Sequence, residues 1–193
     1  MRALLTPSGP RAAPTPTLVH YKIAENLRER AAAFRLCHDA YVQAELMLPA
    51  GCQMRVMPHH LLDSSAIFIA VQAARVISTV SLIGDGQLGL PMECAYREEV
   101  DALRSPARRL AEVSSLANDR AQPVCQFHLL GNLTRLMAQY AKHHGVEHLL
   151  AAVHPRHVRF YERCLGFQRL GPGKAYPAVR YRPSVPLVLD LPR

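Results

Sequence analysis

A glutamate stands within a segment of apolar and small residues near the middle of the chain. Residues Arg109 to Ala117 read RLAEVSSLA, which we interpret as a core strand with Glu112 inside it. Glutamate is depleted in strands, and burial of an unpaired carboxylate is unfavourable, so this position needs a reason. A desolvated carboxylic acid has a raised pKa and can accept a proton near neutral pH, as a general base does. Glu112 is therefore a candidate base, and the alternative is a structural glutamate paired with an arginine. Side chains alternate along a strand, so the face of Glu112 should also carry Leu110, Ser114 and Leu116.

The composition is that of a globular domain. The chain has 193 residues, of which 49% are hydrophobic and 20% are charged, enough for one well-buried core. No apolar stretch approaches the ~20 residues of a membrane-spanning helix, and the start of the chain lacks the apolar segment of a secretory signal. Five cysteines form no CxxC pair. An odd number of cysteines argues against a disulfide framework, so we expect a cytoplasmic protein.

The charge favours anionic partners. The formal net charge is +8, which suits nucleic acid, phosphates, acidic proteins or a membrane surface. The basic residues are scattered, with no dense basic run and no zinc-finger spacing, so nucleic-acid binding is not expected. His154 and His157 are three residues apart, but no third ligand accompanies them, and we expect no metal site.

The order of predicted elements indicates the fold class. Residues 1–17 contain four prolines, and we expect a flexible segment there, followed by a single domain over 18–193. Periodicity and turn residues predict the remaining elements. In chain order these are a strand at 18–23, one or two helices over 24–47, a hairpin of strands at 66–71 and 76–83, a helix at 94–104, the Glu112 strand, a helix at 126–144, a strand at 148–153, a helix at 156–165 and a strand at 187–191. This order predicts an α/β fold in which a central mixed sheet has helices on both faces.

A second segment carries a family resemblance. Residues 154–167 read HPRHVRFYERCLGF and resemble the strand–helix–Gly-Phe closing segment of the GNAT acyltransferase fold. Together with GLPME at 89–93 and the Glu112 strand, the stretch from about residue 20 to 191 resembles the FeeM-type N-acyl amino acid synthases. The resemblance implies a GNAT-like fold related to the acyl-homoserine lactone synthases. It also implies transfer of a long-chain fatty acyl group from acyl carrier protein to the α-amine of an amino acid, with tyrosine as the acceptor.

The chain departs from the lactone synthases where those enzymes hold S-adenosylmethionine. Their E-x-S strand continues with Arg, where this chain has Ser115, and two other Arg positions fall on Cys37 and Ser81. Of their two acidic residues before the hairpin, Asp63 alone remains. We therefore do not expect S-adenosylmethionine as a substrate.

The chain also departs from GNATs that use coenzyme A. Those enzymes follow the Glu112-equivalent strand with a glycine-rich turn whose amides hold the pyrophosphate. Residues 118–126 read NDRAQPVCQ here, and the next glycine is Gly131. A carrier-bound pantetheine has a single phosphate, so the missing glycines favour acyl carrier protein as the donor. The net charge of +8 agrees, because carrier proteins are acidic.

The resemblance implies a site in a V-shaped gap between the Glu112 strand and the next one. Glu112 would be the base, and Ser114 would assist or fill space. Tyr161 stands where many GNATs place a tyrosine near the leaving sulfur, and the alternative is a packing tyrosine. Amide donors to the tetrahedral oxyanion would come from the bulged strand at Val113, Ser115 and Leu116.

Two further sets of residues would surround this gap. A basic rim for the carrier protein and its phosphopantetheine would comprise Arg120, Arg135, Lys142, Arg156 and Arg159, and Gln126 would bind the phosphopantetheine with them. An apolar tunnel for the acyl chain would be built from Phe34, Tyr41, Leu46, Met47, Phe68 and Ile69, unless these are simple core residues. Glu93 follows a Pro-Met turn, and we expect it to be exposed. No permanently bound cofactor is expected.

Two other functions fit the same residues. One is a coenzyme A-dependent N-acetyltransferase acting on a small amine. The other is a non-catalytic protein that keeps the fold and uses its basic surface to bind an acidic partner or nucleic acid.

Overall fold

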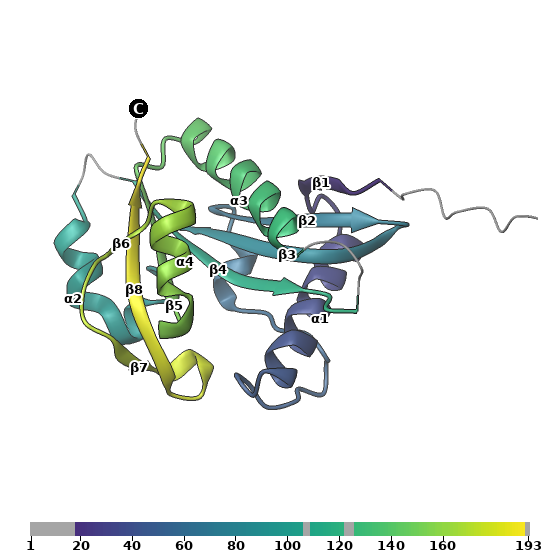
Figure 1. The fold of residues 1–193 in the computed structure, drawn as a ribbon, viewed down its shortest axis with the longest axis horizontal. Coiled ribbons are helices and arrows are strands. Elements are labelled where there is room, and N and C mark those ends of the chain that lie inside the picture. Colours follow the sequence, from purple (N-terminus) through teal and green to yellow (C-terminus); the bar gives the residue numbers. More distant parts are fainter. Residues whose placement is uncertain (1–17, 106–108, 122–125, 192–193) are drawn as a thin grey trace, which may run out of the picture.

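A mixed β-sheet organises the part of the chain that the computed structural model describes, residues 18–105, 109–121 and 126–191. The sheet order is β1-β2-β3-β4-β5-β8-β6, and β7 pairs with β8 (Figure 1). The strands are β1 (His20–Ile23), β2 (Ser65–Gln72), β3 (Arg75–Gly84), β4 (Leu110–Asn118), β5 (His148–Val153), β6 (Gln168–Arg169), β7 (Lys174–Tyr176) and β8 (Arg182–Asp190). The helices are α1 (Leu27–Gln43), α2 (Glu93–Leu103), α3 (Gln126–His143) and α4 (Pro155–Leu165), with 3₁₀ turns η1 (Pro58–Leu61) and η2 (Pro177–Val179).

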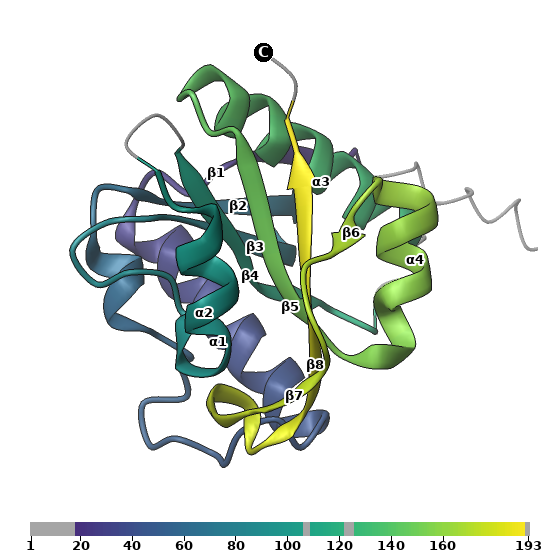
Figure 2. The same ribbon diagram turned by 90° about the vertical axis from the view of Figure 1, so that its left-hand side faces the viewer.

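Helices cover both faces of the sheet, which confirms the predicted fold class. Helices α1 and α2 lie on one face, and α3 and α4 lie on the other (Figures 1 and 2). Strand β2 explains this arrangement through its alternation. Phe68 and Ala70 pack in the core beneath α3, whereas Ile67 and Ile69 pack beneath α1. Both faces of the strand are therefore buried, as its continuous apolar sequence requires.

Several element bounds differ from the prediction. The region 24–47 contains one helix, α1, which begins after Asn26 and ends at Gln43; the side chain of Asn26 accepts a hydrogen bond from the Glu29 N–H at 2.9 Å. The last strand begins at Arg182 rather than 187, because Arg182 and Pro183 are exposed and the prolines at 183 and 186 interrupt the strand signal. Strands β6 and β7 were not predicted, since they have only two and three residues. The predicted flexible segment 1–17 lies outside the described residues. Within the described ranges, no helix has the length and apolar character needed to cross a bilayer.

The sheet parts between its two central strands. Strands β4 and β5 pair in parallel only where Leu110 to Glu112 face His148 to Leu150. Beyond that point β4 continues beside β3 to Asn118, while β5 continues beside β8 to Val153. Glu112 is thus the last residue of β4 to pair with β5, at the apex of the gap that the family resemblance implies.

Candidate active site

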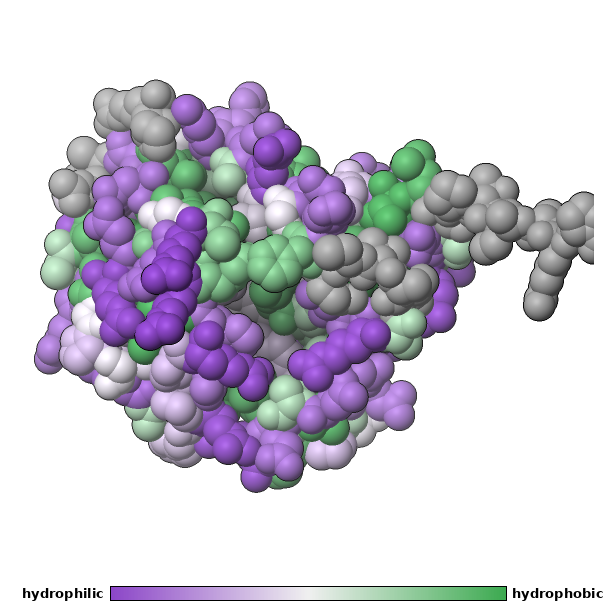
Figure 3. Space-filling model, viewed as in Figure 1, coloured by the Kyte–Doolittle hydropathy of each residue, from purple (hydrophilic) through white to green (hydrophobic). Residues whose placement is uncertain are grey.

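A cavity of about 520 Å³ opens where β4 and β5 diverge. Its walls come from β4, the end of β5, the first turns of α4, the end of α1 with the loop that follows, and the segment from β7 into β8. The surface is hollowed between the side that carries α4 and β8 and the side that carries α1 (Figure 3). The cavity therefore joins segments from both faces of the sheet, and it is large enough for part of a substrate rather than a solvent molecule alone.

Glu112 lies in the wall of this cavity and is 2% exposed. The N–H of Met92 donates a hydrogen bond to its Oε2 at 2.7 Å. Among residues 18–105, 109–121 and 126–191, no basic side chain forms an ion pair with it. Burial raises the pKa of Glu112 to about 8, against the opposing effects of the Met92 N–H and of Arg55. The structural alternative, in which an arginine neutralises this glutamate, is therefore not what the structure contains.

Strand β4 is bulged beside the cavity, at Ser115. Thr79 pairs with Ala117 and Ser81 pairs with Ser114, so that two residues of β4 lie opposite one residue of β3. Ser115 has a positive φ of 52°, which is uncommon for a residue other than glycine. Its carbonyl accepts a hydrogen bond from the buried Cys37 thiol at 2.9 Å, which holds the bulge against α1.

The bulge changes which side chains face the cavity. It inserts one residue into the alternation, so Leu116 packs in the same cluster as Ala111 and Val113. The expectation that Leu116 shares a face with Glu112 is wrong for this reason. Val113, Ser114, Ser115 and Leu116 all contribute to the cavity wall. The Ser115 hydroxyl is buried without a hydrogen-bond partner among the described residues. A bulge also leaves ladder groups unpaired, so this stretch can present hydrogen-bond donors to a ligand.

Tyr161 belongs to both the core and the cavity. Its ring packs edge-to-face on Phe167, with centroids 5.4 Å apart, and it is 9% exposed. It also contributes to the cavity wall. Burial raises its pKa to about 12, which keeps the phenol protonated at neutral pH.

The structure brings only some of the residues of the predicted basic rim close to the cavity. Arg156 lines the cavity, and its Nε donates to His157 Nε2 at 3.0 Å. Arg159 is exposed on α4 and Arg120 is exposed in the turn that precedes α3, whose first residue is Gln126. The start of α3 adjoins α4, because the rings of Phe127 and Phe160 meet with centroids 5.1 Å apart.

The other two basic residues of the predicted rim lie farther along α3, away from its start. Arg135 is exposed near the middle of the helix and Lys142 in its last turn. A helix rises 1.5 Å per residue, so Lys142 lies roughly 24 Å from the start of α3. Lys142 cannot be part of a rim at the other end, and this prediction was wrong.

Only some of the residues predicted for the acyl tunnel line the cavity. Tyr41 and Leu46 line the cavity. Phe68 is fully buried against the ring of Tyr140, and Ile69 packs beneath α1. These two residues cannot reach the gap, since β3 separates β2 from β4 in the sheet. Phe34 packs on the ring of His60, and Met47 is half-buried after α1, both outside the described cavity wall. The apolar wall is instead completed by Met57, Leu130, Phe160 and Val179.

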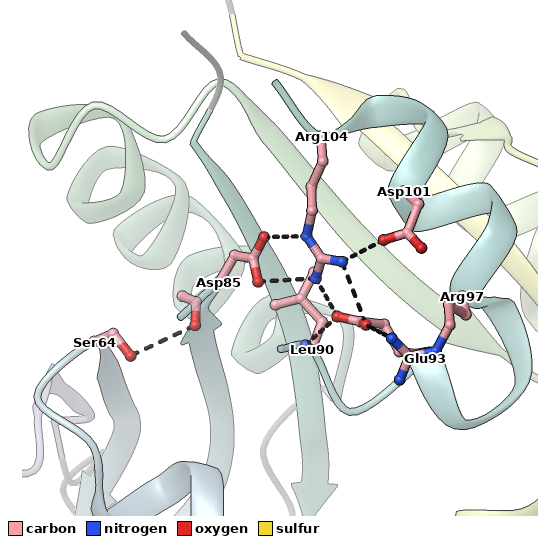
Figure 4. Close-up of polar contacts among 8 residues, drawn as sticks. Ser64, Asp85, Leu90, Glu93, Arg97, Asp101 and Arg104 are labelled. Carbon is pink, nitrogen blue, oxygen red and sulfur yellow. Dashed lines mark hydrogen bonds and ion pairs between the residues drawn. The ribbon is translucent and has the colours of Figure 1, made fainter. Parts of the chain in front are cut away.

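A cluster of charges lies at the turn before α2, the turn that carries the Met92 amide (Figure 4). Arg104, from the end of α2, donates to Asp85 through Nε at 2.7 Å and also contacts Glu93 and Asp101. The Leu90 N–H donates to Glu93 at 2.6 Å. These bonds close the turn before α2, and the next amide in that turn, Met92 N–H, is the one that reaches Glu112. The charges of Asp85 and Glu93 raise the pKa of Arg104, so this cation is permanent.

Glu93 is therefore buried, and the expectation that it would be exposed is wrong. It is 8% exposed. The turn at Gly89, with φ of 65°, folds the chain so closely that a Cβ there would lie 2.5 Å from Glu93 Oε1. The GLPME motif predicts this turn, but Arg104, the arginine that pairs with Glu93, lies outside the motif.

Sequence analysis missed the cavity residues contributed by loops. Arg55 and Met57 come from the segment between α1 and η1, and Tyr176 and Arg182 come from the segment around η2. These segments have no apolar periodicity, so their position over the cavity had no sequence signal. No group of three or more metal-ligating side chains occurs within the described ranges.

Comparisons with known proteins agree with this geometry. The family model for the N-acyl amino acid synthase FeeM matches residues 32–190. The structure of FeeM, an N-acyl amino acid synthase from uncultured soil microbes, superposes with a TM-score of 0.82 at 26% identity and covers 94% of each chain. No curated protein matches the sequence.

More distant structures share the fold. The acyl-homoserine lactone synthase LasI has a TM-score of 0.71 at 14% identity over 91% of each chain. A probable acetyltransferase from Staphylococcus epidermidis has a TM-score of 0.61 at 13% identity, over 91% of this chain and 100% of its own. With its GNAT-like sheet and the family match over most of its length, the chain belongs to the FeeM family of N-acyl amino acid synthases and is an acyltransferase.

Proposed function

We propose that this acyltransferase moves a long-chain fatty acyl group from acyl carrier protein to the α-amine of an amino acid, with tyrosine as the acceptor. The observation that carries the proposal is Glu112, a buried carboxyl with a pKa of about 8 at the point where β4 and β5 part. A carboxyl in this state binds and releases a proton near neutral pH, and the acylation of an amine requires such a step.

The reaction would run in the gap. The pantetheine arm would lie between β4 and β5 with its thioester near the bulge at Ser115. An amine attacks a carbonyl only through its free electron pair, so Glu112 would take the proton that the attacking nitrogen loses. The new C–N bond would form as the carbonyl oxygen becomes an oxyanion, stabilised by amides of Val113, Ser115 and Leu116, and Ser114 would line this point.

Collapse of this intermediate would break the C–S bond. The pantetheine thiolate would then leave and take up a proton, and Tyr161, whose pKa of about 12 keeps it protonated, is the candidate donor. The products would be an N-acyl amino acid and the free carrier thiol. No permanently bound cofactor is needed.

Charge and the sequence after β4 support acyl carrier protein as the donor. The net charge of +8 suits an acidic partner. Arg156 at the cavity and Arg159 on α4, with Arg120 and Gln126 before and at the start of α3 and Arg135 near its middle, would receive the carrier protein and its phosphopantetheine. The absence of glycine between residues 118 and 126 gives no cradle for a pyrophosphate. Four described cysteines are free thiols, as in a reducing compartment, and we propose a cytoplasmic location.

The test is a choice between donors. The protein is incubated with a mixture of amino acids and either long-chain acyl carrier protein or acetyl-coenzyme A, and acylated products are identified by mass spectrometry. We expect N-acyl amino acids from the carrier protein, with tyrosine the preferred acceptor. Product from acetyl-coenzyme A alone would show a coenzyme A-dependent acetyltransferase, and no product from either would favour a binding protein.

A further inference from the structure

Arg55 places an unneutralised positive charge in the wall of the cavity. It lies in the loop between α1 and η1, where its backbone N–H donates to the Phe34 carbonyl at 3.0 Å. Its guanidinium carbon lies 4.4 Å from the centroid of the Tyr41 ring, a cation–π contact. The loop is thus fixed to α1, and the aromatic ring holds the guanidinium in place.

The two other arginines of the cavity differ from Arg55: Arg182 has a carboxylate partner, and Arg156, which has none among the described residues, lies on the opposite side at α4. Arg182 forms an ion pair with Glu45 at 2.8 Å, and Arg156 contacts His157. Within the described ranges, no carboxylate forms an ion pair with Arg55. The charge of Arg55 nevertheless acts on the groups around it, since it partly offsets the rise that burial causes in the pKa values of Cys37, Tyr41 and Glu112. A partly buried guanidinium without a carboxylate is unfavourable unless a ligand supplies the anion.

The location of Arg55 indicates which part of a substrate supplies that anion. Glu112 lies on the α1–α2 face of the sheet, where it bonds to Met92, and Arg55 reaches the cavity from the same side. Arg156 approaches from α4 on the opposite face (Figures 1 and 2). An anion beside Arg55 would therefore lie on the same side of the cavity as the carboxyl that would accept the amine's proton, and on the other side from the candidate phosphate site. An amino acid carries its amine and its carboxylate on one carbon, which suits this pair of groups.

We propose that Arg55 binds the α-carboxylate of the amino acid acceptor, with Tyr41 orienting the guanidinium, and so selects amino acids over simple amines. The inference rests on the proposed function. A guanidinium can donate two parallel hydrogen bonds to a carboxylate. Charge and geometry together then hold the acceptor amine toward Glu112.

The experiment compares an amino acid with its decarboxylated amine, for example tyrosine with tyramine, as acceptors in the presence of acyl carrier protein. For Arg55→Gln we expect kcat/KM for the amino acid to fall about 10²-fold, as for loss of one partner in a buried charge pair. The value for the amine and the KM for the acyl donor should each change less than about threefold. Arg55→Lys keeps the charge without the fork and should give an intermediate loss.

Arg182→Gln is the matched control, because it removes a cavity arginine that already has a carboxylate partner. It should keep the preference for the amino acid. A second readout does not depend on turnover: the N-acyl amino acid product should raise the melting temperature of the wild type more than its decarboxylated analogue, and Arg55→Lys should reduce that difference.

The inference is overturned if Arg55→Gln keeps the preference for the amino acid, or if the KM for the acyl donor rises instead, which would assign Arg55 to the phosphate. If Arg55→Gln does not fold, an unchanged product preference in Arg55→Lys overturns it. If the wild type acylates no amino acid, the proposed function itself fails.

Discussion

Two glutamates are buried beside Met92: Glu93 follows it in the chain, and Glu112 accepts a hydrogen bond from its N–H. Their charged surroundings are opposite. Glu93 is 8% exposed, accepts a hydrogen bond from Leu90 N–H, and forms ion pairs with Arg104 and Arg97. Glu112 is 2% exposed and accepts one backbone hydrogen bond, and burial raises its pKa to about 8. The same type of side chain is thus neutralised by arginine in one place and, among the described residues, has no ion-pair partner in the other. The first arrangement holds a turn in place, and the second keeps a carboxyl able to exchange a proton.

The largest expected effect is on turnover. Glu112→Gln keeps the size of the side chain and an acceptor for the Met92 N–H but removes the base. We expect kcat to fall about 10²- to 10⁴-fold with little change in the KM of either substrate. Glu93→Gln is the matched control, and steady-state kinetics should show kcat within about tenfold of wild type. Equal losses in the two variants would remove the distinction between the glutamates.

Stability should depend on pH through Glu112. Its pKa is raised from 4.5 to about 8 in the folded protein, so between these values the folded state binds the proton more tightly than the unfolded state. The contribution of Glu112 to the free energy of unfolding is therefore expected to be greatest below pH ~5 and to decrease as pH rises toward 8, by on the order of 4 kcal/mol. Urea denaturation at several pH values, with wild type and Glu112→Gln compared, checks this. The variant should lack the decrease, and parallel curves would argue against a raised pKa.

We expect the charge cluster around Glu93 to contribute to the stability of the fold more than to turnover. Arg104→Met leaves Glu93 buried without its main cation, and we expect a loss of about 2 kcal/mol in the free energy of unfolding. Arg97→Met is the matched control, because the Arg97 side chain is 69% exposed; its effect should be below ~0.5 kcal/mol. Chemical denaturation measures both. Similar midpoints for the two variants would show that the cluster does not hold the turn.

The smallest expected effect is that of the Tyr161 hydroxyl. Tyr161→Phe keeps the ring packed on Phe167 and removes only the proton donor. We expect kcat to fall about tenfold, less than is usual for loss of a general acid, because a thiolate can leave without being protonated, and we expect the melting temperature to be nearly unchanged. An unchanged kcat would leave Tyr161 as a packing residue.

Periodic features of the molecule could be predicted from the sequence, whereas its loops could not. Glu112 stood out because a charged residue interrupted an apolar strand, and the helices and the hairpin were read from apolar spacing. The bulge at Ser115 was implied by the family resemblance alone, because no glycine marks its positive φ. The acyl-tunnel prediction used Phe68 because the sequence does not give strand order, and β3 lies between that residue and the gap. Arg104 was missed because its partners Asp85 and Glu93 lie in other segments of the chain. Arg55 was missed because the cavity that it lines exists only in the folded protein.

The account depends most on the protonation of Glu112, which ¹³C NMR can follow directly. Protein with ¹³C-labelled glutamate side chains is titrated, and the Glu112 carboxyl signal is assigned by its loss in Glu112→Gln. The account predicts a midpoint of about 8. A midpoint close to 4.5 would mean that the carboxyl is ionised throughout the neutral range, and it would contradict a desolvated base at the apex of the gap.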